Sequence, residues 1–115
     1  DLGAVLQGGM GMAASGNVGD HHAFFEPVHG SAPKHAGQNK VNPIASINSI
    51  QMMLDWLGRK NGEEGLVQVA QLIDDSVAEH LRGGKSLTYD LGGTATCSDV
   101  GQSISNILST KLSEL

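Results

Sequence analysis

Three stretches with apolar residues at helical spacing fill most of this 115-residue chain, and only one short stretch is typical of a strand. The helical patterns begin near Asn42, Asn61 and Ser98, and the strand is expected at residues 21–28. One strand cannot form an independent sheet, so the helices should cover a sheet completed by chain elsewhere. The pattern therefore predicts an α/β fold, mostly helical here, with residues 1–115 forming one partial domain without an internal boundary.

Cap residues predict where the helices begin and end. Asn42 and Pro43 are typical of an N-cap and a first helical residue, since Asn accepts a free backbone N–H and Pro has none. Gly58 is expected to end the first helix, Gly83 the second, and Ser98 to cap the third. The first helix should belong to the core through an apolar stripe of Ile44, Ile47, Ile50, Met53, Leu54 and Leu57.

The flanking regions carry weaker signals. Residues 1–7 have the pattern of a helix interior without a cap, and the chain does not begin with Met, so we expect a piece of a longer polypeptide. The glycine-rich residues up to Gly19 are expected to form a loop, and residues 86–96 a connection with a possible short strand.

Composition narrows the classes of partner. A formal charge of -5, seven Lys and Arg residues and 3% aromatic residues give no basic surface and little to stack on bases, so nucleic acid is not an expected partner. No apolar run approaches the roughly 18 residues that span a bilayer, and no membrane partner is expected. The single cysteine, Cys97, cannot form an intramolecular disulfide, which fits the cytoplasm, or the mitochondrial matrix in a eukaryote.

The segment of residues 25–43, F-E-P-V-H-G-S-A-P-K-H-A-G-Q-N-K-V-N-P, combines rigid corners with polar side chains. Pro27 and Pro33 fix the backbone, while Gly30 and Gly37 allow positive φ or close approach to a ligand. Imidazole, ammonium, hydroxyl and carboxamide groups lie between them. The segment predicts a nucleotide-binding loop, and a long connecting loop is the alternative.

Two other candidate motifs fail on their context. Gly9, Gly11 and Ala14 match G-x-G-x-x-A, but no strand precedes them and no helix follows, which excludes a Rossmann fingerprint. His21 and His22 would point to opposite faces of a strand, and the five histidines show no metal-ligand spacing. No structural metal site is expected from them.

The 25–43 segment closely resembles the coenzyme loop of the isocitrate and isopropylmalate dehydrogenase family, the metal-dependent β-decarboxylating dehydrogenases. The resemblance extends to D-L-G-A-V-L-Q-G-G-M-G-M-A-A-S-G-N-V-G at the start and to L-G-G-T-A-T-C-S-D-V-G near the end of the chain. It implies the C-terminal part of a three-layer α/β/α large domain, which binds NAD(P) without a Rossmann unit.

The resemblance also implies a reaction and a set of sites. Such enzymes oxidise and decarboxylate a 2-hydroxy acid with NAD(P)+ while Mg2+ or Mn2+ acts as a Lewis acid. Asp1 matches one of the metal-ligating aspartates. Positions that contact the coenzyme, with Glu26 on the nicotinamide side, are matched by Glu26, His29, Gly30, Ser31, Ala32, Lys34, His35, Val41, Asn42 and Tyr89.

Coenzyme choice is expected to depend on Lys34, because Lys favours the 2′-phosphate of NADP where NAD-dependent members tend to have Asp. Tyr89 also matches a residue that contacts this phosphate. His35 and Gly93 depart from the family pattern, which has Tyr and Arg there. We therefore predict NADP as the preferred coenzyme, with NAD as the alternative.

The family's substrate-binding arginines and its catalytic Tyr and Lys find no match in the chain, which contains no expected catalytic residue. The chain alone is expected to be inactive. The resemblance favours isocitrate dehydrogenase, with isopropylmalate or a related dehydrogenase second, and a non-catalytic nucleotide-binding regulatory subunit as an alternative of another class. Family members are usually homodimers or larger homo-oligomers, and the same is expected here.

Overall fold

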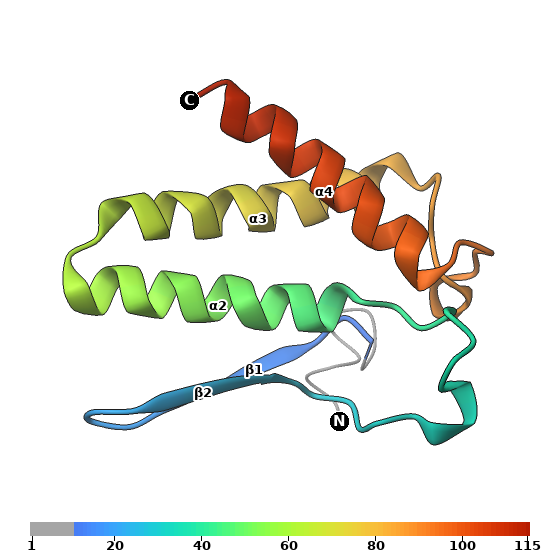
Figure 1. The fold of residues 1–115 in the computed structure, drawn as a ribbon, viewed down its shortest axis with the longest axis horizontal. Helices are drawn as coiled ribbons and strands as arrows, with labels where there is room; N and C mark the ends of the chain where they lie inside the picture. The colour runs from blue at the N-terminus through green and yellow to red at the C-terminus, as the bar shows by residue number, and fades with distance from the viewer. Residues whose placement is uncertain (1–10) are drawn as a thin grey trace.

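A computed structural model describes residues 11–115, in which a β-hairpin and three helices are stacked in the order hairpin, α2, α3, α4 (Figure 1). The expected helical pattern at residues 1–7 lies outside the described residues. The family-like α/β class is confirmed, with two antiparallel strands covered on one face by helices. Within residues 11–115, none of the helices is both long and apolar enough to cross a membrane.

The hairpin joins β1 (Ala14–Val18) to β2 (Ala23–Pro27), with register from Ala14 opposite Pro27 to Val18 opposite Ala23. The expected strand is confirmed at β2, but the loop expected at residues 14–18 was wrong. A-S-G-N-V shows little alternation of apolar residues, and it becomes a strand because β2 pairs with it. The Gly19 N–H donates to the His22 carbonyl at 2.8 Å and closes the turn.

Helix α2 (Ile44–Asn61) packs against both strands and runs past Gly58, where the sequence predicted its end. A Cβ on Gly58 would lie 2.7 Å from the Val67 side chain and 2.9 Å from the Glu63 carbonyl oxygen. This glycine therefore permits close contact with the following helix. Gly62, at φ 68, terminates α2 instead, since a left-handed residue suits the C-cap.

Helices α3 (Glu64–Gly83) and α4 (Cys97–Ser113) complete the described chain. Helix α3 begins three residues after the expected Asn61 and reaches Gly83 as predicted, with left-handed Gly84 as its cap. Ser98 was the wrong N-cap for α4, because Thr96 and Asp99 form a reciprocal capping box two residues earlier. The possible strand at residues 86–96 is a short 3-10 helix, Tyr89–Leu91.

One small core unites the three helices beside the start of α2. Its buried members are Ile44 of α2, Val77 of α3, and Val100 and Ile104 of α4. This core fixes the N-terminus of α2, where the 25–43 segment ends. The rest of the predicted apolar stripe is less buried, and Ile50 is 53% and Met53 36% exposed.

Candidate functional site

The 25–43 segment leaves β2, turns through a 3-10 helix at Pro33–His35, and returns to the start of α2. Three of its residues adopt left-handed backbone, namely Gly37 at φ 78, Ala32 at φ 44 and Asn39 at φ 54. Such angles are uncommon for residues other than glycine, so the surrounding contacts must hold Ala32 and Asn39 in place. The positive φ expected at Gly37 is confirmed. The segment is a shaped loop with fixed corners.

Asn42 joins this loop to two other segments. It is only 7% exposed. Its Oδ1 accepts from the Ile44 N–H at 2.9 Å, so Asn42 caps α2 from one residue before the N-cap position that Pro43 occupies. Its Nδ2 donates to Asp90 Oδ2 at 3.1 Å, and Asp90 Oδ1 accepts from the Thr88 hydroxyl. The predicted helix start and a turn nearly fifty residues later are thus hydrogen-bonded through one side chain.

A second group of side chains stands at the other side of the loop. The Tyr89 hydroxyl lies 3.3 Å from His35 Nε2, and the two rings are 5.5 Å apart. The Lys40 ammonium lies 5.3 Å from the centre of the Tyr89 ring, a cation–π distance. Two NADP-related residues inferred from the family resemblance therefore adjoin each other, and Lys40 adds a cation that sequence reasoning did not select.

These groups surround a hollow of about 370 Å³, whose lining is Gly11, His29, Gly30, Ser31, Ala32, His35, Val41, Asn42, Tyr89 and Asp90. Eight of the ten residues expected to bind coenzyme are among them. Glu26 and Lys34 are not among them; Glu26 lies on β2, Lys34 lies in the 3-10 helix, and both are exposed. We refer to this hollow below as the loop hollow.

Sequence reasoning missed Gly11 and Asp90. Asp90 directly follows Tyr89, which the sequence did select, but the sequence gives no sign of the hydrogen bond between Asp90 and Asn42. Gly11 was considered only as part of the rejected dinucleotide fingerprint, and its role here is steric. A Cβ at this position would lie 2.8 Å from Asp90 Oδ2, and the Gly11 carbonyl accepts from the Ala45 N–H at 3.1 Å. A larger residue here would displace the Asp90 carboxylate, which accepts from Asn42.

The residues of the loop hollow fit a nucleotide. Ala32 and Val41 offer apolar surface, the fixed Asn42 and Asp90 offer polar groups for a base or a ribose, and Lys40 offers positive charge for a phosphate. In addition, His35 Nδ1 is buried without a hydrogen-bond partner in residues 11–115. A buried nitrogen without a partner is uncommon and suits a site that a ligand completes.

Gly93 does not simply replace the arginine of related enzymes. A Cβ at this position would stand 2.0 Å from the Leu87 carbonyl oxygen and 2.6 Å from its carbonyl carbon. The backbone from Leu87 to Gly93 is closed by bonds from Gly93 N–H to Thr88 and from Ala95 N–H to Leu87. Any side chain at residue 93 requires a different course of this turn. The cation that stands over the Tyr89 ring is Lys40.

The metal site expected from Asp1 lies outside the described residues. Among residues 11–115, no group of three His, Cys, Asp or Glu side chains could hold a metal ion.

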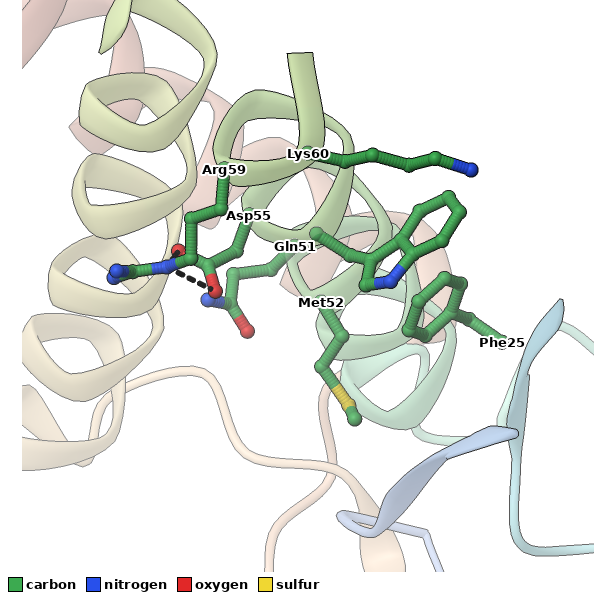
Figure 2. A pocket seen from close by; sticks show the side chains of 7 residues that line it. Phe25, Gln51, Met52, Asp55, Arg59 and Lys60 are labelled. Carbon is green, nitrogen blue, oxygen red and sulfur yellow. Dashed lines mark hydrogen bonds and ion pairs between the residues drawn. The ribbon is translucent and has the colours of Figure 1, made fainter. Parts of the chain in front are cut away.

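A second hollow, of about 490 Å³, lies on α2 beside β2 (Figure 2). Apart from Phe25, all its lining residues belong to α2. Figure 2 shows Asp55 and Arg59 turned toward each other while Lys60 points away to the other side, and Arg59 Nε lies 3.0 Å from both Asp55 oxygens. Lys60 lies 4.7 Å from the Trp56 ring centre. We refer to it below as the helix hollow.

One buried histidine lies in the helix layer. His80 of α3 is 5% exposed, and its Nδ1 lies 2.8 Å from the Ser103 hydroxyl of α4. Burial lowers the pKa of His80 from its ordinary 6.5. The neutral imidazole is therefore the form that joins α3 to α4.

The hairpin, the helices and the loop hollow define an α/β segment in which residues 11–115 contain no Rossmann unit. Residues 1–104 match the family model described as isocitrate/isopropylmalate dehydrogenase, and the chain belongs to this family. The family prediction made from the 25–43 segment is confirmed.

Individual relatives agree with the family match. The chain is 46% identical over 112 residues to homoisocitrate dehydrogenase of Methanocaldococcus jannaschii, which covers 97% of this chain and 30% of the relative. It is 46% identical over 100 residues to 3-isopropylmalate dehydrogenase of Thermobifida fusca, and this match covers 80% of this chain and 26% of the relative. A crystal structure of the apo β-decarboxylating dehydrogenase from Thermococcus kodakarensis superposes with a TM-score of 0.84 at 40% identity, over 98% of this chain and 31% of that chain.

The chain therefore spans about a third or less of the proteins that it matches.

Proposed function

We propose that this chain is the coenzyme-binding segment of a dehydrogenase that oxidatively decarboxylates a 2-hydroxy acid with NADP+ and Mg2+ or Mn2+, with isocitrate as the substrate. The observation that carries this proposal is the loop hollow. Eight residues that the family resemblance assigns to coenzyme binding line it, and the Asn42–Asp90 hydrogen bond ties two distant parts of its wall. The oxidoreductase family to which the chain belongs supplies the reaction class.

In this proposal the chain's own residues bind and orient the coenzyme. Ala32 and Val41 give an apolar wall against which an adenine can pack. The Asn42 carboxamide is held by its bonds to Ile44 and Asp90, so its position needs no reorganisation when the coenzyme enters. The bound coenzyme supplies the hydride acceptor. Orientation by groups fixed in this way is the contribution that the segment makes to the rate.

Preference for NADP is supported by two lysines. Lys34 is exposed and free to reach a phosphate, and Lys40 stands over Tyr89 at 5.3 Å. An ammonium group attracts a 2′-phosphate, whereas an acidic residue in the same place would repel it. The test is kcat/KM with NADP and with NAD for the complete polypeptide and for its Lys34→Asp and Lys40→Met variants. Both variants should lose preference for NADP, and a wild-type ratio favouring NAD tenfold would refute the proposed preference.

The choice of substrate needs its own measurement, because the relatives' names include homoisocitrate and 3-isopropylmalate dehydrogenases. We favour isocitrate because Lys34 and Tyr89 resemble residues of NADP-dependent isocitrate dehydrogenases. The 3-isopropylmalate alternative is supported by the Thermobifida fusca relative. The deciding measurement compares initial rates of coenzyme reduction with isocitrate, homoisocitrate and 3-isopropylmalate in the presence of Mn2+. If the complete polypeptide binds coenzyme but reduces it with none of these acids, the enzyme proposal fails and a regulatory nucleotide-binding role takes its place.

A further inference from the structure

The first turn of α4 receives its caps from two different segments. A helix begins with backbone N–H groups that have no partner within the helix. Here the Asp99 N–H donates to Thr96 Oγ1 at 3.1 Å, which is a local cap. The Cys97 N–H donates to the Asn39 carbonyl at 2.9 Å, and the Ser98 N–H donates to Asn39 Oδ1 at 3.0 Å. Two of the three N–H groups are therefore satisfied by a residue almost sixty positions earlier.

Asn39 is held in an uncommon conformation by these bonds. Its φ is 54, in the left-handed region, which Asn adopts at a lower energy cost than most residues other than glycine. The Ser98 hydroxyl also donates to Asn39 Oδ1 at 3.0 Å, so one carboxamide oxygen accepts twice. Side chain and backbone of Asn39 together make three bonds to α4.

The outer part of the 25–43 segment has few other attachments among the described residues. Within the turn, the Gln38 carboxamide donates to the Lys34 carbonyl, and the Gln38 N–H donates to His35. Outside the segment, the His35–Tyr89 contact at 3.3 Å joins it to the rest of the chain. Asn42 anchors the inner end, three residues after Asn39. The outer part of the loop is thus fastened to the helices at Asn39.

Resting on the proposed coenzyme function, we propose that Asn39 is the positioning residue of the loop hollow: by capping α4 it fixes His35, Lys40 and Val41 around the bound nucleotide. Asn39 itself is not among the residues that line the hollow. Its action is on the neighbours that do, and on the Lys40 ammonium beside Tyr89. The chemistry recognised is that of a phosphate-bearing nucleotide held by a loop whose outer end is docked on a helix N-terminus.

The test compares Asn39→Ala with Asn39→Asp in the complete polypeptide. Aspartate keeps the acceptor oxygen and suits a helix N-terminus, whereas alanine removes the acceptor and tolerates positive φ poorly. We expect Asn39→Ala to raise KM and Kd for the coenzyme about fivefold, the change that loss of one helix cap corresponds to, with kcat within about twofold. Asn39→Asp should retain wild-type values. Asn106→Ala, on the exposed side of α4, is the matched control.

Hydrogen exchange separates this inference from the proposed function. Amides of residues 30–42 and of the first turn of α4 should exchange about fivefold faster in Asn39→Ala than in wild type, without coenzyme present. Unchanged exchange, or an Asn39→Asp variant as impaired as Asn39→Ala, would overturn the inference. If the wild type binds no coenzyme, the proposed function fails, and the exchange rates still decide whether Asn39 fixes the loop. If Asn39→Ala does not fold, Asn39→Gly, which keeps the left-handed backbone, replaces it.

Discussion

The loop hollow and the helix hollow differ in how their walls are assembled. The helix hollow is the larger, at about 490 Å³ against about 370 Å³, yet its wall comes from α2 and one strand residue. Its ion pair, Asp55 and Arg59, lies four residues apart along one helix, and Lys60 donates to the His21 carbonyl of the hairpin. The wall of the loop hollow comes from Gly11, the 25–43 segment and Tyr89–Asp90, which are joined by bonds across 48 and 54 residues.

The two hollows therefore depend on the rest of the fold to different degrees. The Asp55–Arg59 pair keeps its arrangement wherever α2 exists, so the helix hollow requires only that the hairpin meet α2 at Phe25 and Lys60. The loop hollow requires three distant segments to meet, with glycine at residue 11 and left-handed backbone at Ala32 and Asn39. Local strain of this kind is typical of functional sites because only the surrounding structure maintains it. Size alone would have selected the helix hollow.

The largest effect is expected at Gly93, whose alanine variant should disrupt the turn that carries Tyr89 and Asp90. The new Cβ would lie 2.0 Å from the Leu87 carbonyl oxygen, so the backbone must move. We expect the free energy of unfolding to fall by about 3 kcal/mol, the upper range for overpacking, and coenzyme binding to be lost. Urea unfolding and coenzyme titration measure the two effects. Gly101→Ala, where a Cβ meets nothing within 4 Å, is the control.

A Gly93→Ala variant with wild-type stability and coenzyme affinity would show that the turn does not shape the loop hollow.

The second effect concerns Asn42 and Asp90. Asn42→Ala leaves the Ile44 N–H without its acceptor and Asp90 without a donor, which should lower the free energy of unfolding by about 2 kcal/mol. Coenzyme affinity should fall about 30-fold if the free energy of coenzyme binding is weakened by the same amount. A double-mutant cycle with Asp90→Ala should be non-additive, because the two side chains bond to each other. Additive losses would mean that the Asn42–Asp90 bond contributes nothing to the site.

Sequence reasoning reached the helices and most of the site but not the way the site closes. Helical patterns are local, so α2 and α3 were found with errors of a few residues at their ends. Gly58 illustrates the limit, since a glycine needed for close packing against Val67 has the same appearance in sequence as a glycine that ends a helix. Strand β1 was missed because its partner β2, and not its own composition, makes it a strand.

Within the site, the residues contributed by one continuous segment were predictable and the bonds between segments were not. His29 to Asn42 carry a motif in the sequence, and their shared hollow follows from it. Asp90 and Asn39 act through partners 48 and 59 residues away, and no local pattern indicates such a contact. All ten coenzyme-binding residues stay predictions, and Glu26 and Lys34 differ from the other eight because neither lines the loop hollow in residues 11–115.

A third and smaller effect concerns pH, which should change the stability of the helix layer through His80 of α3. Burial lowers the pKa of His80, so the folded state holds this ring neutral while the unfolded state takes up a proton near 6.5. The contribution of His80 to stability is therefore complete above this pH and is lost as the pH falls below it. Urea unfolding at pH 7.5 and 5.5 should show a larger loss for wild type than for His80→Gln. Equal losses would mean that the His80–Ser103 contact does not respond to protonation.

The smallest effect is expected in the helix hollow, where Asp55→Ala removes the partner of Arg59. Both side chains are well solvated, at 35% and 70% exposed, so their pair should contribute no more than about 0.5 kcal/mol. Coenzyme affinity should be unchanged, since no residue is shared between the two hollows. Arg59→Ala serves as the matched control and should match Asp55→Ala within error. A severalfold change in coenzyme Kd from Asp55→Ala would show that the two hollows are coupled through α2, whose first turn is capped by Asn42.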